Sequence, residues 1–392
     1  MKKLKIGAVT TWPPHRDGIA IYSAELYRSL SANAEIDVFA NKRPGQLRNS
    51  AEEPKGLVVI ETWRRGSILF PLQILKNVLR SKPDIVHVQH GWLLYGGPPE
   101  SLMLPPFLLL LRLSHRPLII TMHTIVRRGL VRYRFPLANQ IVNLATLGIT
   151  KMLALFSSQI IVLNDLARKV LLEEFGVRKD KVSIIPHGLK RANKSSENKW
   201  KANPLILSLG FLRKGKELDS LITGFQDFTM KYPDATLFVV GGVHAHDNAT
   251  YSAMLKDLAS YPEVMKKAIF WNFATENQLD DFVSASDAVV LLSSEHFYVE
   301  SSGALARVAD FEKPVICSKV PKFQAELTDG LNCIMVKPQD PKSLSEALCM
   351  LIEKKELSSK IALNLRTRFG ANYWDSIAKK HLELYEAVLG DS

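Results

Sequence analysis

The chain has 392 residues, of which 46% are hydrophobic and 23% charged, and this composition excludes disordered and fibrous proteins. At about 100–200 residues per domain, the length predicts two or three domains. Residues 1–200 carry 30 Lys and Arg against 14 Asp and Glu, a net charge of +16, whereas the remainder, with 21 against 25, carries −4. This asymmetry predicts an anionic partner for the first half, with simple solubility as the alternative.

Short apolar runs alternate with amphipathic helical segments along the whole chain. Strands are predicted at 4–9, 35–40, 57–61, 85–89, 118–122, 159–163 and 182–185, then at 205–209, 236–240, 268–271, 288–292, 314–318 and 333–336. Helices are predicted between them, for example at 21–31, 218–231, 276–284 and 341–353. Continuously apolar strands separated by helices indicate parallel sheets covered on both faces.

The most apolar stretches are residues 102–113 and 135–163. The first is shorter than the ~18–20 residues needed to cross a bilayer. The second contains regularly spaced polar residues and predicts a buried amphipathic helix followed by a strand. We expect no membrane-spanning segment, while peripheral attachment to a membrane stays open.

The polar stretch 190–203 has no periodicity and predicts a linker. The fold class is therefore α/β, with two doubly wound Rossmann-like domains at 1–198 and 199–372, and a terminal helix at 373–392 expected to pack back on the first. Ligands of such sheets bind beyond the carboxyl ends of the strands, which predicts a cleft where the two domains face each other. The cysteines Cys317, Cys333 and Cys349 form no C-x-x-C pair and favour a reducing, cytoplasmic location.

Two glycine-containing loops could bind phosphate. Gly18 precedes a predicted helix after the first strand, where backbone N–H groups and the helix N-terminus favour an anion; an ordinary loop glycine is the alternative. In the second half a strand runs into Gly210, followed by Arg213, Lys214 and Lys216. Arginine and lysine beside a helix N-terminus suit a diphosphate, and the alternative is a solvated basic turn.

A third loop, after the strand at 288–292, carries Glu295 and Glu300 and leads through Ser301, Ser302 and Gly303 into a helix. Carboxylates next to a helix N-terminus could hold the hydroxyls of a sugar and a phosphate. An ordinary serine N-cap is the alternative interpretation.

Three histidines, His90, His123 and His187, follow predicted strands. A single strand-end histidine is usually a packed polar residue, but three at the edge where ligands bind favour a function. Their spacing fits no zinc site, so we expect no metal.

A basic patch of Arg127, Arg128, Arg132 and Arg134 follows His123, and residues 101–150 contain no acidic residue. Without aromatic platforms or a recognised motif, this patch does not predict nucleic-acid binding. It favours an anionic lipid surface or a pyrophosphate-linked acceptor.

In their order, these segments resemble the retaining glycosyltransferases of family 4, which have the GT-B fold. The resemblance covers nearly the whole chain and includes WPPHRDGIA, PDIVHVQHGWLLYGG, TMHT, VSIIPHGL, GFLRKGKELDSLI and FATENQLDDFVSASDAVVLLSS. It implies a glycosyltransferase that moves a sugar from a UDP- or GDP-linked donor, bound by the second domain, to a glycan or lipid-linked acceptor on the side of the first. No metal or other cofactor is implied.

The resemblance also implies residue roles. Arg213 and Lys216 would neutralise the donor diphosphate, His123 would contact the transferred sugar, and Gly18 would lie near the phosphates or acceptor. The sequence departs from the family pattern at Arg307, where a second glutamate is usual, and at Glu312, where glycine is usual. Which of Glu295 and Glu300 faces the sugar stays open. Alternatives are a nucleotide-sugar epimerase or phosphorylase of the same fold, and a non-catalytic protein that binds sugars or nucleotides.

Overall fold

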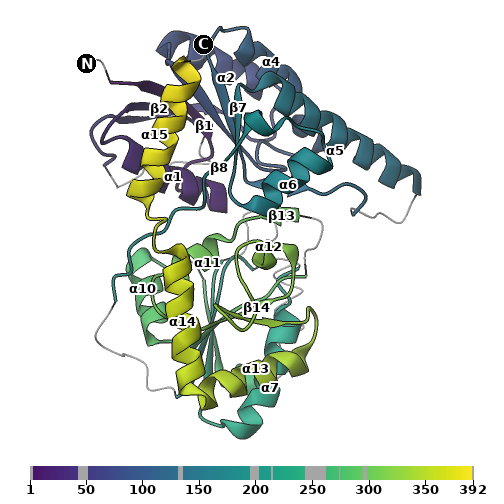
Figure 1. The fold of residues 1–392 in the computed structure, drawn as a ribbon, viewed down its shortest axis with the longest axis vertical. Helices are drawn as coiled ribbons and strands as arrows, with labels where there is room; N and C mark the ends of the chain where they lie inside the picture. The colour runs from purple at the N-terminus through teal and green to yellow at the C-terminus, as the bar shows by residue number, and fades with distance from the viewer. Residues whose placement is uncertain are drawn as a thin grey trace. The chain divides into compact units, whose positions relative to one another are not determined.

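A computed structural model describes residues 3–42, 52–130, 136–194, 203–212, 215–242, 262–272, 274–294 and 298–390. The chain divides into two compact units (Figure 1). Unit 1 comprises Met1–Gly188, Phe297–Ser301 and Trp374–Ser392, and unit 2 comprises Leu189–His296 and Ser302–Tyr373. The described residues 190–194 of the polar stretch therefore belong to unit 2. The arginines Arg132, Arg134 and Arg213, and Glu295, lie outside the described residues.

Unit 1 contains a seven-stranded sheet in the order β3-β2-β1-β4-β5-β7-β8, with every neighbouring pair parallel. Its strands are β1 (Lys5–Thr10), β2 (Glu35–Asn41), β3 (Leu57–Trp63), β4 (Ile85–His90), β5 (Leu118–Met122), β7 (Gln159–Val162) and β8 (Val182–Ile184). The strand order reverses between β1 and β4, the position where doubly wound sheets bind ligands.

Helices cover both faces of this sheet. One hydrophobic core lies under α2 (Phe70–Ser81), α4 (Leu104–Arg112), α5 (Pro136–Phe156) and α6 (Asp165–Glu173). The other lies under α1 (Gly18–Leu30) and α15 (Trp374–Gly390). Unit 1 also contains two short elements, α3 (Pro98–Leu102) and the 3-10 turn at Lys179–Lys181. Asp17 starts α1 because its Oδ1 accepts a hydrogen bond from the N–H of Ala20 at 2.7 Å.

The last helix of the chain, α15, belongs to unit 1 and packs beside α1 (Figure 1). Its residues Ile377, His381 and Tyr385 are fully buried. The core of unit 1 is therefore completed by residues that follow the whole of unit 2 in the sequence.

Unit 2 contains a six-stranded parallel sheet in the order β11-β10-β9-β12-β14-β15. Its strands are β9 (Leu205–Leu209), β10 (Thr236–Val240), β11 (Ala268–Trp271), β12 (Ala288–Leu291), β14 (Val315–Ser318) and β15 (Ile334–Val336). The core on one face includes residues of α7 (Leu218–Lys231) and α13 (Pro341–Glu353). The other includes residues of α10 (Glu276–Ala285), α11 (Gly303–Val308), α12 (Pro321–Gln324) and α14 (Lys355–Phe369). The short helix α9 (Pro262–Met265) precedes β11.

Every strand predicted from the sequence is present, with ends that differ by at most a few residues. Two further strands, β6 (Thr124–Val126) and β13 (Tyr298–Glu300), form a small antiparallel sheet in unit 1. Both have only three residues, too few for an alternating pattern to stand out in the sequence.

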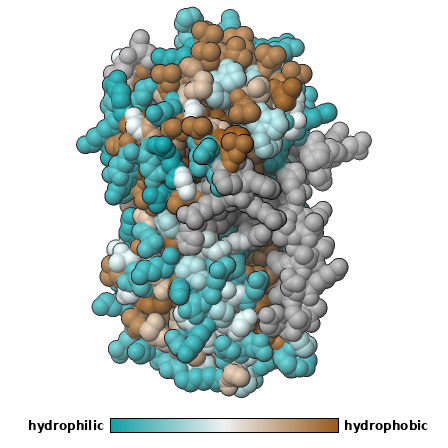
Figure 2. Space-filling view, turned by 90° about the vertical axis from the view of Figure 1, so that its right-hand side faces the viewer, coloured by the Kyte–Doolittle hydropathy of each residue, from teal (hydrophilic) through white to brown (hydrophobic). Residues whose placement is uncertain are grey.

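The predicted burial of the helix in residues 135–163 is wrong. These residues form α5 and β7, but Leu137, Ile141, Leu144 and Leu155 expose 68%, 58%, 68% and 68% of their surfaces. The buried residues of α5 lie in its second half and include Ile149, Leu153 and Ala154, which belong to the core of unit 1. Figure 2 shows hydrophobic side chains gathered on the surface of unit 1. No helix among the described residues is both long and apolar enough to cross a membrane.

Gly188 marks a close approach within unit 1. A Cβ atom placed there would lie 2.2 Å from Cδ2 of Trp374, the first residue of α15. Trp374 also lies against the ring of His187, with centroids 5.5 Å apart. The absence of a side chain at position 188 therefore allows the aromatic ring of Trp374 to contact the backbone.

Gly188→Ala should lower the free energy of unfolding by about 1–3 kcal/mol, because the added methyl group overpacks this contact. Urea denaturation followed by tryptophan fluorescence measures the change. Gly148→Ala is the matched control, since a Cβ in that turn of α5 meets nothing within 4 Å. It should leave stability unchanged or raise it by up to about 1 kcal/mol. Equal effects of the two substitutions would contradict the packing described here.

The core under α15 also contains two histidine rings, His87 and His381, with centroids 5.8 Å apart. Burial lowers the pKa of His381 to about 4 and that of His87 well below its usual value. Both are neutral in the folded protein at pH 7, and the unfolded chain binds their protons more readily, with a pKa near 6.5.

Stability should therefore fall as the pH drops below about 6.5. Between pH 7 and pH 5, His381 alone should account for about 2 kcal/mol of the lost unfolding free energy, because the unfolded state becomes protonated and the folded state does not. Over the same pH interval, His381→Gln should lose about 2 kcal/mol less unfolding free energy than the wild type, as measured by urea denaturation. His115→Gln, in an exposed turn, is the control. A wild-type pH dependence retained in His381→Gln would show that this ring becomes charged in the fold.

Candidate active site

The parallel strands of unit 1 bring the three predicted histidines to one edge of the sheet. His90 is the last residue of β4, His123 follows β5, and His187 follows β8. The N–H of His123 donates to the carbonyl oxygen of His90 at 2.9 Å. Tyr22 of α1 packs edge-on against the rings of His123 and His187, with centroid distances of 4.6 Å and 5.1 Å.

Burial makes these histidines neutral. It lowers the pKa of His90 and of His187 to about 4. The pKa of His123 falls to about 3, because burial and then His187 and His90 lower it, while the carboxylate of Glu300 opposes the effect. His123 is 9% exposed and His90 2%. The site thus offers neutral imidazoles to a ligand across the physiological pH range.

The hydrogen bonds of two of these rings are defined. Nε2 of His123 lies 2.7 Å from Oε1 of Gln89, and Nδ1 of His187 lies 2.7 Å from the carbonyl oxygen of Gly188. Because a carbonyl oxygen only accepts, these nitrogens carry the protons. The other ring nitrogen in each case is the one with the lone pair.

The small sheet of β6 and β13 brings Glu300 to the same place. Glu300 pairs in register with Thr124, the residue after His123, and Tyr298 pairs with Val126. The next residue, Ser301, accepts a hydrogen bond from Nδ2 of Asn164 at 3.2 Å. The structure therefore brings together His123 and Glu300, two of the three predicted catalytic residues. The third, Glu295, lies outside the described residues.

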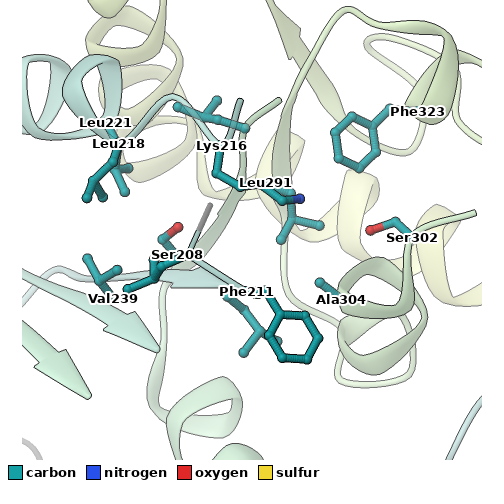
Figure 3. A pocket seen from close by; sticks show the side chains of 14 residues that line it. Ser208, Phe211, Lys216, Leu218, Leu221, Val239, Leu291, Ser302, Ala304 and Phe323 are labelled. Atoms are coloured by element: carbon teal, nitrogen blue, oxygen red, sulfur yellow. The ribbon is translucent and has the colours of Figure 1, made fainter. Parts of the chain in front are cut away.

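In unit 2 a cavity opens at the carboxyl ends of β9 and β12. Gly210, Lys216 and Ser302, all predicted to bind the donor, line it together with Ser208, Phe211, Leu291, Ala304 and Phe323. In Figure 3 Lys216 and Ser302 lie on different sides of this cavity. A Cβ on Gly241 would lie 1.8 Å from the carbonyl oxygen of Gly210, so this wall depends on the close approach of two loops.

Ser302 has two roles in the structure. Its Oγ accepts a hydrogen bond from the N–H of Leu305 at 3.3 Å, which makes it the N-cap of α11, and it also faces the cavity. Gly303, the first residue of α11, does not line the cavity, and Ser301 belongs to unit 1. Of the predicted serine and glycine cluster, Ser302 is thus the member at the cavity.

The two departures from the family pattern have structural explanations. Arg307 of α11 forms ion pairs with Asp280 and, at 2.9 Å, with Glu276. Its side chain is 13% exposed and joins α11 to α10. Glu312 pairs with Arg366 and, at 3.1 Å, with Lys194. Both residues are held in ion pairs within unit 2.

The described arginines of the basic patch are partly neutralised. Nη2 of Arg127 lies 2.7 Å from Oε1 of Glu174, and the backbone N–H of Arg128 donates to the other carboxylate oxygen at 3.0 Å.

Gly18 is the first residue of α1, and a Cβ there would meet nothing within 4 Å. Among the described residues, no group of three or more His, Cys, Asp or Glu side chains is arranged to hold a metal.

Four residues that contact this site were not predicted from the sequence: Gln89, Tyr22, Asn164 and Trp374. One signal was present for the first of these: in the strand 85–90, which reads IVHVQH, His87 and Gln89 are two residues apart and therefore share one face of the sheet. The packing of Trp374 on the first unit has no such local signal.

Comparison with known proteins agrees with the fold. The family model for glycosyltransferase family 4 matches residues 16–192, and that for glycosyl transferases group 1 matches residues 190–368. Solved structures with the same fold include Anabaena HepE in complex with UDP-glucose, 14% identical with a TM-score of 0.72 over 98% of this chain and 100% of that one. Sucrose-phosphate synthase from Thermosynechococcus elongatus is 18% identical, with a TM-score of 0.79 over the full length of both chains.

Among curated relatives, D-inositol 3-phosphate glycosyltransferase from Corynebacterium urealyticum is 24% identical over 50% of this chain and 47% of its own length. Mannosylfructose-phosphate synthase from Agrobacterium fabrum is 24% identical over 55% of this chain and 50% of its own. The chain thus matches about half the length of each curated relative. The two family models together span residues 16–368, both units are Rossmann-like, and the expected GT-B fold is confirmed: the chain belongs to the group 1, family 4-like glycosyltransferases.

Proposed function

We propose that this protein transfers a hexose from a nucleotide-sugar donor to a glycan or lipid-linked acceptor, with retention of the anomeric configuration. The observation that carries the proposal is the cavity of unit 2 at the carboxyl ends of β9 and β12, which is lined by both Lys216 and Ser302. The complex of HepE with UDP-glucose supports a UDP-linked donor over a GDP-linked one.

Charge neutralisation is the chemical task at this cavity. The departing nucleotide diphosphate gains negative charge in the transition state, and an ammonium group placed there lowers the barrier. Lys216 supplies one positive charge, and Arg213, close to it in the sequence, would supply a second. With these cations in place, the reaction as proposed needs no metal or other cofactor.

His123 and Glu300 of unit 1 would act on the sugar. A neutral imidazole can accept a hydrogen bond from a sugar hydroxyl without repelling the positive charge that develops on the ring of the sugar. The carboxylate of Glu300, which raises the pKa of His123 through its charge, is near enough to His123 to favour the same developing charge.

Arg307 and Glu312, the departures that favour a non-catalytic protein, form ion pairs within unit 2, and an assay for sugar transfer distinguishes that alternative. An epimerase or phosphorylase of the same fold is distinguished by product analysis. A transferase releases nucleoside diphosphate only when its acceptor is present.

Lys216→Ala should weaken binding of the nucleoside diphosphate by roughly ten- to a hundredfold, since a charge-assisted contact is worth about 1.5–3 kcal/mol. Calorimetric titration with UDP, GDP and ADP, and then with their sugar conjugates, measures this. The matched control is Lys360→Ala, at an exposed position of α14. Unchanged affinity in Lys216→Ala, or an equal loss in both variants, would place the diphosphate elsewhere.

The acceptor side of the proposal rests on the surface of unit 1. Exposed apolar side chains, Leu109 of α4 and Leu137, Ile141 and Leu144 of α5, lie on two helices that pack together. The same region, residues 101–150, has no acidic residue. Apolar side chains flanked by cations suit the surface of an anionic membrane, where a lipid-linked acceptor would be found.

Replacing Leu137, Ile141 and Leu144 together by Ser should weaken binding to phosphatidylglycerol vesicles about tenfold or more, because each leucine-sized side chain contributes about 1.5–3 kcal/mol when buried. Vesicle flotation measures binding. The control replaces Met230 and Leu363, exposed apolar residues of unit 2, by Ser. Flotation of the triple variant at the wild-type level, or no flotation of the wild type, would rule out this surface as the membrane contact.

A further inference from the structure

Gln89 is a fully buried side chain to which the proposed chemistry assigns no part. It lies on β4, next to His90, with 0% of its surface exposed. Its Oε1 is 2.7 Å from Nε2 of His123, and its Nε2 donates to the hydroxyl of Tyr27 at 2.8 Å. A carboxamide has one accepting and one donating end, so its orientation determines which ring nitrogen of His123 carries the proton.

The donating end is anchored by a buried network. The hydroxyl of Tyr27 lies 3.1 Å from Nδ1 of His87, and the hydroxyl of Tyr385 lies 2.7 Å from the same nitrogen. On the other side of that ring, Nε2 of His87 is 2.8 Å from Oγ1 of Thr121. These residues come from α1, β4, β5 and α15, and a satisfied network of this kind resists rotation of any one member.

With the oxygen of Gln89 facing it, Nε2 of His123 must donate, and Nδ1 then holds a lone pair. Nδ1 of His123 makes no hydrogen bond to any residue that the structure describes, and the ring keeps 9% of its surface exposed. We propose that Gln89 is a positioning residue that fixes His123 in the Nε2–H tautomer and so presents Nδ1 as a hydrogen-bond acceptor to the sugar. The identity of that ligand rests on the proposed function, whereas the tautomer does not.

The groups around His123 agree with a neutral ring. It is faced by His90 after β4, His187 after β8, His381 of α15, Tyr22 of α1 and Glu300 of β13. Burial and the other histidines lower the pKa of His123 to about 3 against the opposing effect of Glu300. A cationic His123 would lose the acceptor at Nδ1. The low pKa of His123 favours the neutral ring, and the carboxamide oxygen of Gln89 favours the proton on Nε2 of that ring.

The test uses long-range 1H–15N spectra of the histidine rings in the full-length protein, with His123→Gln serving only to assign the signals of His123. The wild type should show a protonated Nε2 and an unprotonated Nδ1 at pH 7. In Gln89→Glu, a carboxylate facing Nε2 should raise the pKa of His123 by about 1–3 units. A proton on Nδ1 in the wild type, or an unshifted His123 in the folded Gln89→Glu variant, overturns the proposal.

Thr121→Val is the matched control, because it removes a partner of His87 from the same network and leaves the contact of Gln89 with His123 in place. It should lower thermal stability without changing the titration of His123. A shift of His123 in Thr121→Val as large as that in Gln89→Glu would show that general disturbance of the core, and not Gln89, sets the state of the ring.

Kinetics separate this inference from the proposed function. With an active donor and acceptor, Gln89→Glu should lose kcat as the pH falls from 7 to 5, because His123 then becomes protonated, while the wild-type kcat changes less. No transfer by the wild type would overturn the proposed function and leave the spectroscopic test intact. Transfer whose pH profile is identical in Gln89→Glu and wild type would overturn the role given to Gln89.

Discussion

Parallel strand order is the constraint on which both units depend. Parallel neighbours must be joined by crossovers, so all strands of a sheet end at the same edge, and side chains that follow different strands become neighbours. His90, His123 and His187 are far apart in the sequence and meet because β4, β5 and β8 all point one way. The same rule places Gly210, after β9, near the turn that follows β12. Each site lies at the edge of a sheet where the parallel strands end, so neither site needs a special local fold.

Burial then determines the chemistry of that edge in unit 1. Imidazoles that remained solvated would be partly charged near neutral pH, but here the cost of desolvation exceeds the attraction of the nearby Glu300. The ring of His123 is consequently available as a polar, uncharged group. Burial also removes these polar atoms from water, and Gln89, Tyr27 and Thr121 provide hydrogen-bond partners for several of them.

The strands and the Rossmann-like architecture of both units could be predicted from the sequence, because apolar runs are local patterns. The histidines after three of the strands could be chosen as candidates for the same reason. Contacts between particular side chains of distant segments could not be predicted. The ion pair of Arg307 with Asp280 joins two helices, and nothing in the local sequence of either helix indicates it. Leu137 and Ile141 suggested a buried helix because hydrophobicity alone does not say whether a partner element exists to cover it. The pairing of β6 with β13 joins segments more than 170 residues apart through three-residue strands, below the length at which periodicity is informative.

The position of α15 has a consequence for how the chain is made. During synthesis, residues 3–188 emerge first, yet the face of their sheet under α1 lacks Ile377, His381 and Tyr385 until the ribosome has finished unit 2. Unit 2 is nearly contiguous in the sequence and can close its own core earlier. The nascent protein therefore carries an incompletely covered hydrophobic face in its older half until α15 has been made.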